Sequence, residues 1–328
     1  MIVGGGAVWL AVSVAGGFGD AWSALGRVQV WWLVPAVVCE GFSYFLAGAR
    51  LRRLAGPRAH FTAVSATGVE LVVNGLGLLT PASPAEGLAF EVSELSRRGL
   101  DRRQITLTLG FEQWFNLRVF LLVNALNLSW VIGTRDLPVD STWAVVAATA
   151  VLVTLATTGI LANRPVTAEA LVVAVGVLRF WRPRPSLPDR RAAGAVFYAD
   201  AMAVLGPVRR RIVFPALSAT SMLANVACLF FVLIAAHARV GFDIALLTAG
   251  AAAAAGLIPL LPGGIGVVEA IIPAVVHWYG PPFEAALAAA LVYRALGTFL
   301  PAAAGGVALL ALRASRSKGV STAPLRSS

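Results

Sequence analysis

Apolar runs of about 20 residues recur along the chain, and no other feature restricts its fold as strongly. A helix of that length crosses the hydrocarbon core of a bilayer. The runs are blocks of Ala, Leu and Val rather than alternating apolar and polar residues, so they do not resemble the strands of a transmembrane barrel. Charged residues make up only 13% of the 328 residues, about half the share usual in soluble proteins. We therefore predict an all-α polytopic membrane protein.

Six apolar runs are predicted to cross the membrane as single helices: residues 3–18, 30–49, 104–133, 142–162, 212–237 and 284–312. Two more apolar blocks, residues 62–98 and 243–280, are interrupted by Pro, Gly and polar residues. Each block is long enough for two short spans or for one re-entrant hairpin, and the sequence leaves both open. Broken helices persist inside a bilayer only where protein or a water-filled cavity satisfies the freed backbone groups.

The charged residues predict the orientation of the chain. Lys and Arg number 26 against 16 Asp and Glu, which gives a net charge of +10. The basic residues lie mainly between apolar runs, so we attribute them to the positive-inside rule and to anionic lipid, and expect no nucleic-acid partner. We place the basic clusters in the cytoplasm, and with them the C-terminus of a multi-pass protein of the cytoplasmic (inner) membrane. The clusters occupy residues 50–58, 97–103, 164–211 and 313–326.

With this orientation, the chain contains two span–hairpin–span units of opposite direction, at about residues 30–133 and 212–312. "LLTPASPAE" (78–86) corresponds to "LLPGGIGVVE" (260–269): an apolar pair, a group of helix breakers and a carboxylate. Gly99 precedes Glu112 by thirteen residues, and Gly280 precedes Tyr293 by the same interval. We predict inverted repeats with broken or re-entrant helices, a design found in many transporters.

The domain organisation follows from these repeats. Residues 1–315 form a single transmembrane domain, in which residues 163–211 are an Arg-rich cytoplasmic linker. Residues 316–328 are predicted to be a disordered cytoplasmic tail. The hairpin tips are predicted to act as hinges through Pro81, Pro84, Pro262, Gly263, Gly264 and Gly266.

Charged side chains inside predicted spans are candidates for a functional site, because inserting each one costs roughly 2.5–3.5 kcal/mol. Glu269 follows the break at Pro262, and Arg294 lies ten residues into the next span. Two interpretations are open: the two residues form an ion pair that only locks the hairpin against its span, or at least one of them has a functional role such as binding a lipid phosphate. For Glu112 and Arg118 structural and functional roles are both open. For Glu40 and Glu70 a partner on a neighbouring helix is favoured over a functional role, and for Asn225 helix association is favoured over ligand binding.

Other chemistries lack the residues they need. Cys39 and Cys228 both lie in predicted spans, which argues against a disulfide or a zinc site. The three His residues are isolated, and there is neither a phosphate-binding loop nor a Ser/His/Asp arrangement. We expect no metal, no cofactor and no enzymatic activity.

The block Pro262, Gly263, Gly264, Gly266 and Glu269, followed by Tyr293 and Arg294, resembles the C-terminal motif of the flippase-like membrane proteins related to the transmembrane region of lysylphosphatidylglycerol synthase. In the family's first-half motif, Pro81, Glu86 and Glu112 match, whereas Ala85, Gln113 and Asn116 replace the usual Gly, Arg and Asp. The resemblance implies a protein that flips or handles phospholipids or isoprenoid-linked lipids. Lysyl transfer itself is not expected.

We predict a lipid transporter in which the two hairpins meet at a polar midplane site for an anionic headgroup. The predicted substrate-binding residues are Glu269, Arg294, Tyr293, Glu86, Glu112, Gln113, Asn116, Arg118 and Asn74. An ion gradient acting through a carboxylate, or a downhill lipid gradient, would supply the energy. One alternative is a non-transporting scaffold that holds a lipid-modifying or glycosyltransferase partner at residues 163–211. Another is an intramembrane enzyme with paired carboxylates; the oligomeric state is open.

Overall fold

The computed structural model describes residues 23–79, 83–135, 149, 152, 187–256 and 267–320. Every regular element within these ranges is a helix, which confirms the predicted all-α class. The helices are α3 (Leu33–Ala55), α4 (Ala63–Leu79), α5 (Ser83–Arg97), α6 (Arg102–Thr134), α9 (Leu187–Leu205), α10 (Val208–Ala235), α11 (Phe242–Gly256), α12 (Val267–Trp278) and α13 (Phe283–Val320), with short 3-10 turns at Val30–Trp32 and Pro57–Ala59. The spans predicted at 3–18 and 142–162 lie outside the described residues.

Four helical segments are long and apolar enough to cross a membrane: Val30–Ala55, Arg102–Thr134, Arg211–Ala235 and Phe283–Leu310. They correspond to four of the predicted spans. The local sequence explains their ends. The chain leaves α3 at Gly56, whose φ of +75° suits glycine, and Pro57 follows directly. A capping box opens α6, in which Asp101 accepts from the Gln104 backbone and the Gln104 side chain accepts from the Asp101 N–H.

Each interrupted block forms two shorter helices. Block 62–98 becomes α4 and α5, with 17 and 15 residues, and block 243–280 contains α11 and α12, with 15 and 12 residues. At 1.5 Å per residue these helices measure about 18–26 Å, less than the hydrocarbon thickness of about 30 Å. The inverted and re-entrant arrangement of these pairs stays a prediction.

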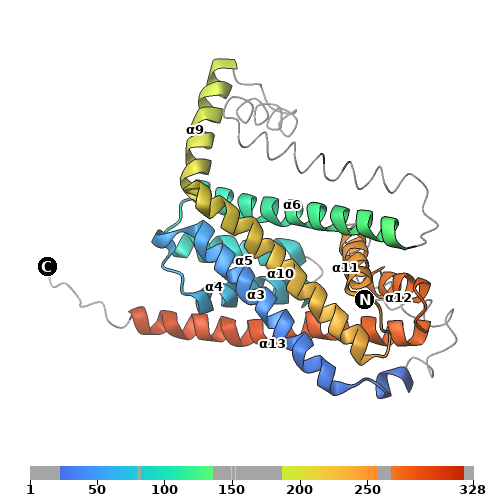
Figure 1. The fold of residues 1–328 in the computed structure, drawn as a ribbon. Coiled ribbons are helices and arrows are strands. Elements are labelled where there is room, and N and C mark those ends of the chain that lie inside the picture. The colour runs from blue at the N-terminus through green and yellow to red at the C-terminus, as the bar shows by residue number, and fades with distance from the viewer. Residues whose placement is uncertain are drawn as a thin grey trace.

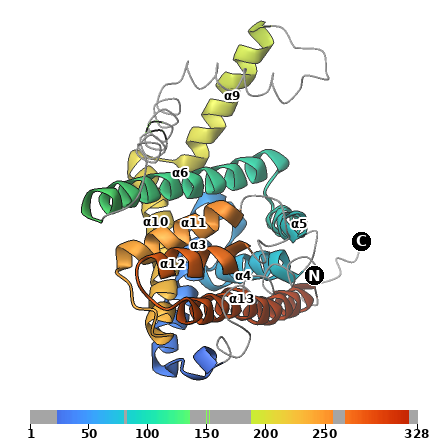
Figure 2. The same ribbon diagram turned by 90° about the vertical axis from the view of Figure 1, so that its right-hand side faces the viewer.

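The long and short helices pack side by side (Figures 1 and 2). Helix α3 runs along α10, and α4 runs along α13, while α6 contacts α10, α11 and α3. Two glycines let the backbone of α4 approach its neighbours closely. A Cβ on Gly48 of α3 would lie 2.5 Å from the Thr67 backbone nitrogen of α4, and a Cβ on Gly305 of α13 would lie 2.6 Å from the Leu71 carbonyl oxygen. These contacts hold α4 between α3 and α13.

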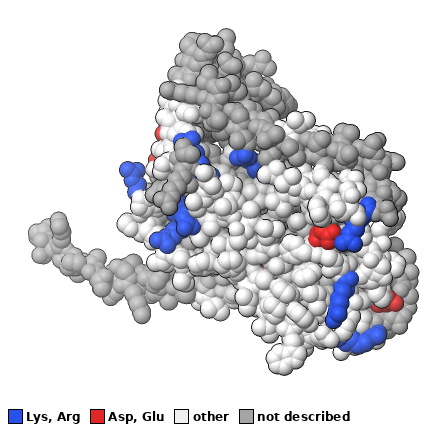
Figure 3. All heavy atoms as spheres, viewed as in Figure 1, with Lys and Arg blue, Asp and Glu red and all other residues white. Residues whose placement is uncertain are grey.

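The outer faces of the long helices are apolar. Trp31 is 86% exposed, and Val38, Leu126, Phe299 and other large apolar residues of the four long segments are also exposed. Figure 3 shows a broad uncharged face between charged side chains that gather toward its two ends. Apolar surface of this extent is unusual on a soluble monomer and is what lipid contact requires. The molecule is a multi-pass integral membrane protein.

At the C-terminal end, α13 continues to Val320, so residues 316–320 are helical rather than part of the predicted disordered tail. The stretch "RASRSK" (313–318) contains neither Gly nor Pro, so no helix-breaking residue ends the helix before Gly319. Within the predicted linker, α9 is helical and packs against α6.

Candidate functional site

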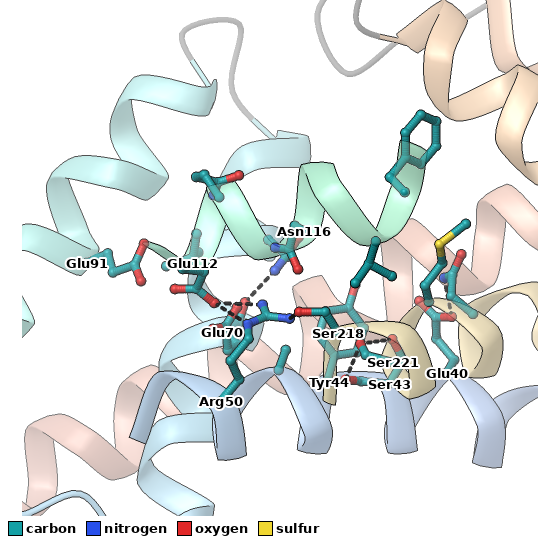
Figure 4. Close-up of a pocket in the computed structure, with 18 residues that line it drawn as sticks. Glu40, Ser43, Tyr44, Arg50, Glu70, Glu91, Glu112, Asn116, Ser218 and Ser221 are labelled. Atoms are coloured by element: carbon teal, nitrogen blue, oxygen red, sulfur yellow. Dashed lines mark hydrogen bonds and ion pairs between the residues drawn. The ribbon is translucent and has the colours of Figure 1, made fainter. Parts of the chain in front are cut away.

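A cavity of about 450 Å³ lies between α3, α4, α5, α6 and α10, and Figure 4 shows the residues around it. Helix α3 lines it with residues 40, 43, 44, 47 and 50, which recur every three or four positions and therefore share one face. The lining residues are Glu40, Ser43, Tyr44, Ala47, Arg50, Glu70, Val73, Asn74, Glu91, Glu112, Gln113, Asn116, Val119, Phe120, Ser218, Ser221, Met222 and Asn225. Polar side chains therefore predominate in a region that lies among three helices long enough to cross the membrane, α3, α6 and α10, and the shorter α4 and α5.

Arg50 is the only basic residue among those that line this cavity. Its Nη2 lies 2.7 Å from Glu112 Oε1 and its Nε 3.2 Å from the same oxygen, while Nη1 donates to Ser218 Oγ at 3.1 Å. Both charged residues are only 4% exposed. Arg50 thus joins α3, α6 and α10 through charge-assisted hydrogen bonds.

Three buried carboxylates meet beside Arg50. Glu70 of α4, Glu91 of α5 and Glu112 of α6 each offer an oxygen within 4.8 Å of the others. Oxygen atoms with this spacing can bind a cation. Glu70 Oε1 is buried and has no hydrogen-bond partner among the described residues. When all four side chains are ionised, the guanidinium balances only one of the three negative charges.

A second polar group lies farther along α3. Asn225 of α10 donates to Glu40 Oε2 at 2.9 Å and accepts from the Tyr293 hydroxyl of α13 at 2.8 Å. Ten residues separate Glu40 from Arg50, which corresponds to a rise of about 15 Å along the helix. The polar lining of the cavity therefore extends over about half the thickness of a bilayer core. The roles predicted for Glu40 and Asn225 agree with these contacts.

The structure brings Glu269 and Arg294 together, but outside the lining of the cavity. Arg294 Nε donates to Glu269 Oε1 at 3.0 Å, which joins α12 to α13. This is the ion pair considered as the first alternative in the sequence. Tyr293, which precedes Arg294 in α13, donates to Asn225 of the cavity lining.

The other predicted site residues divide into two groups. Asn74, Glu112, Gln113 and Asn116 line the cavity. Glu86 is exposed in the first turn of α5, and the Arg118 guanidinium lies 4.2 Å from the centre of the Trp114 ring; neither lines the cavity.

The predicted hinge residues are mostly not described. Pro84 lies in the first turn of α5. Pro81, Pro262, Gly263, Gly264 and Gly266 lie outside the described residues.

Several polar residues of the lining are not among the residues predicted from the sequence, and Arg50, Glu91 and Ser218 are three of them. In the sequence, Arg50 belongs to the basic cluster at residues 50–58, although its spacing from Glu40 and Ala47 puts it on the same helix face as these two. Glu91 follows Gly87 by one helical turn. A Cβ on Gly87 would lie 2.9 Å from the Val73 carbonyl oxygen, so that face of α5 packs on α4. Ser218 carries no comparable signal.

Comparison with known proteins identifies the family. No curated protein matches the chain. The family model described as the lysylphosphatidylglycerol synthase transmembrane region matches residues 1–323, nearly the whole chain. That match links this membrane protein to lipid metabolism and agrees with the residues that suggested the resemblance. The chain belongs to the family of the lysylphosphatidylglycerol synthase transmembrane region.

Proposed function

We propose that the protein is a flippase-like transporter that moves an anionic or isoprenoid-linked lipid between leaflets. The observation that carries this proposal is the polar cavity of about 450 Å³ among helices whose outer faces are apolar. A polar headgroup loses its hydration when it crosses a bilayer, and a cavity with hydrogen-bonding walls replaces it. The acyl or isoprenoid chains would stay in the surrounding lipid.

The packing of the helices supports an alternating mechanism. Helices α3 to α6 and α10 to α13 each form a series of one long, two short and one long helix. The first short helix of each series packs on the last long helix of the other: α4 packs on α13, and α11 packs on α6. Gly99 and Gly280 occupy corresponding turns with φ of +85° and +106°. These correspondences support inverted repeats that rock against each other.

The charges of the cavity indicate which headgroups to test. Arg50 supplies a planar guanidinium that binds phosphate by paired hydrogen bonds. The carboxylates of the cavity would repel an anion unless they are neutralised, and they would favour a headgroup with an ammonium group. The transport panel therefore contains phosphatidylglycerol, phosphatidylethanolamine and an isoprenoid phosphate.

The test is movement of labelled lipid in liposomes that contain the purified protein. We expect the wild type to equilibrate at least one of these lipids between leaflets. Arg50→Lys keeps the charge but loses the fork of donors, so we expect the rate to fall by about tenfold or more. Arg52→Lys is the matched control, because Arg52 is exposed two residues away on the same helix.

Two results would contradict the transport proposal. One is a wild type that moves none of the labelled lipids. The other is an Arg50→Lys variant with the full rate, because the polar cavity would then have no part in lipid movement. Glu269→Gln and Arg294→Ala extend the series to the ion pair of α12 and α13. A scaffold for a partner enzyme would show no transport in any of these proteins.

A further inference from the structure

The three carboxylates next to Arg50 have a property that lipid binding alone does not explain. Glu70, Glu91 and Glu112 come from three different helices, and their oxygens lie within 4.8 Å of one another. They are 9%, 8% and 4% exposed. Charges of one sign at this distance, away from water, repel each other strongly, so the cluster needs a further cation to be stable.

The charged neighbours identify where that cation binds. From α3, Arg50 contacts Glu112 through Oε1. Glu70 Oε1, by contrast, is buried with no hydrogen-bond partner in the described part of the chain. Figure 4 shows Glu70 and Glu112 converging on Arg50, with Glu91 approaching from α5. The open position in the cluster is therefore at Glu70.

Among the described helices around the cluster, no other residue of the cavity lining contributes a balancing charge. Helix α10 faces Arg50 with the neutral Ser218, and α3 adds Tyr44 and, farther along, the acidic Glu40. Helix α13 packs on α4 through close contacts at Gly305 and Pro301, which carry no charge. Arg50 is thus the one cation that the described lining supplies for these carboxylates.

We propose that Glu70, Glu91 and Glu112 form a proton-binding site that couples lipid movement to a proton gradient. The inference rests on the proposed transport function and names its energy source. A proton adds to a carboxylate oxygen of the cluster from one side of the membrane and leaves as a proton to the other side. The protonated cluster has less negative charge, so an anionic headgroup can reach Arg50. A proton fits better than a divalent metal ion because it neutralises one carboxylate without placing a divalent cation next to the guanidinium.

The first experiment detects the proton without transport. An infrared pH titration of the purified protein in lipid should show the C=O band of a protonated carboxyl group at neutral pH. We expect Glu70→Gln to remove or shift this band. Glu94→Gln should leave it in place, because Glu94 is equally buried on α5 but forms an i,i+4 ion pair with Arg98 at 3.0 Å. Glu91→Gln is a second variant of the cluster in case Glu70→Gln does not fold.

The second experiment measures coupling. In proteoliposomes with a pH difference of one unit, coupling of one proton to one lipid should drive the leaflet ratio of labelled lipid up to about tenfold. Glu70→Gln should still move the labelled lipid but distribute it equally between the two leaflets despite the pH difference. Glu94→Gln should behave as wild type. A chelator and added Mg²⁺ should change neither result.

The outcomes separate the two proposals. If the wild type equilibrates lipid but ignores the pH gradient, the proton site is wrong and the transport function stands. If the wild type moves no lipid, the transport function is wrong. The infrared band then still shows whether the cluster holds a proton. If the infrared band or the leaflet ratio of labelled lipid depends on Mg²⁺, the cluster binds a metal ion and the proposal of a proton site is wrong.

Discussion

At the scale of single residues, Arg50 shows how strongly a side chain depends on its surroundings. Arg50, Arg52 and Arg53 stand within four positions of one another, yet Arg50 is buried against Glu112 while the other two are exposed. The helical twist turns Arg50 toward α6 and α10. A basic residue at the end of an apolar run can therefore be an exposed charge at the membrane surface or a buried member of an ion pair, and only the contacts in the folded protein distinguish the two.

Removing one member of this buried pair should be costly. Arg50→Met leaves the Glu112 carboxylate buried without its cation, so we expect the free energy of unfolding to fall by about 3–5 kcal/mol. The double variant Arg50→Met, Glu112→Leu should recover most of this loss, because an apolar pair of similar volume avoids the uncompensated charge. Equilibrium unfolding in mixed micelles measures both.

The exposed neighbour again provides the control. Arg52→Met should change the free energy of unfolding by no more than about 0.5 kcal/mol. A double variant as unstable as Arg50→Met alone would show that the guanidinium stabilises the fold through other contacts than Glu112.

At the scale of the helices, the contact between α4 and α13 depends on close packing rather than on hydrophobicity. Lipid tails are as apolar as Leu, so helices in a membrane associate through small residues that let backbones approach. Gly305 of α13 touches the Leu71 backbone of α4, whereas the adjacent Gly306 has nothing within 4 Å of a Cβ position. The two glycines are adjacent in sequence but differ in what lies against them.

This difference gives a matched pair of substitutions. Gly305→Ala would place a Cβ 2.6 Å from a backbone oxygen, so α4 and α13 must separate, and we expect destabilisation of about 1–3 kcal/mol. Gly306→Ala meets open space within a helix and should be neutral or stabilising by up to about 1 kcal/mol. Thermal unfolding of both variants in the same detergent tests the pair. Equal effects of the two substitutions would refute the α4–α13 contact.

At the scale of the whole molecule, exposed tryptophans lie at one end of the long helices α3 and α6, and arginines lie at the other end. Trp31, Trp130 and Trp278 are exposed near the start of α3, the end of α6 and the end of α12. Arg52, Arg53, Arg102 and Arg103 occupy the other ends of α3 and α6. Tryptophan prefers the membrane interface, and basic residues prefer the cytoplasmic side. The basic ends are therefore predicted to lie in the cytoplasm.

Cysteine labelling in intact cells tests this orientation. With Cys39 and Cys228 replaced by Ala, Arg102→Cys should react with a membrane-impermeant reagent only after the cells are opened. Arg239→Cys should react in intact cells, because residue 239 follows α10 at the opposite end. Both positions are exposed. The reverse pattern of labelling would invert the proposed topology, and labelling of both sites in intact cells would contradict the span assignment between them.

The sequence by itself determined the class of the protein, four of its long helices and the two breaks at residues 62–98 and 243–280. Hydrophobic length, helix-breaking residues and caps act locally along the chain, so the sequence shows them directly. It also identified Glu112, Gln113, Asn116 and Asn74 as members of a polar site.

Only the tertiary structure decided which polar residues meet. It placed Arg50 and Glu91 in the cavity, left Glu86 and Arg118 outside its lining and paired Glu269 with Arg294. The physical reason is that each site contact joins helices far apart in the sequence, such as Arg50 and Glu112, which are separated by 62 positions. Local patterns determine which face of a helix is polar. The packing of small residues determines which faces meet.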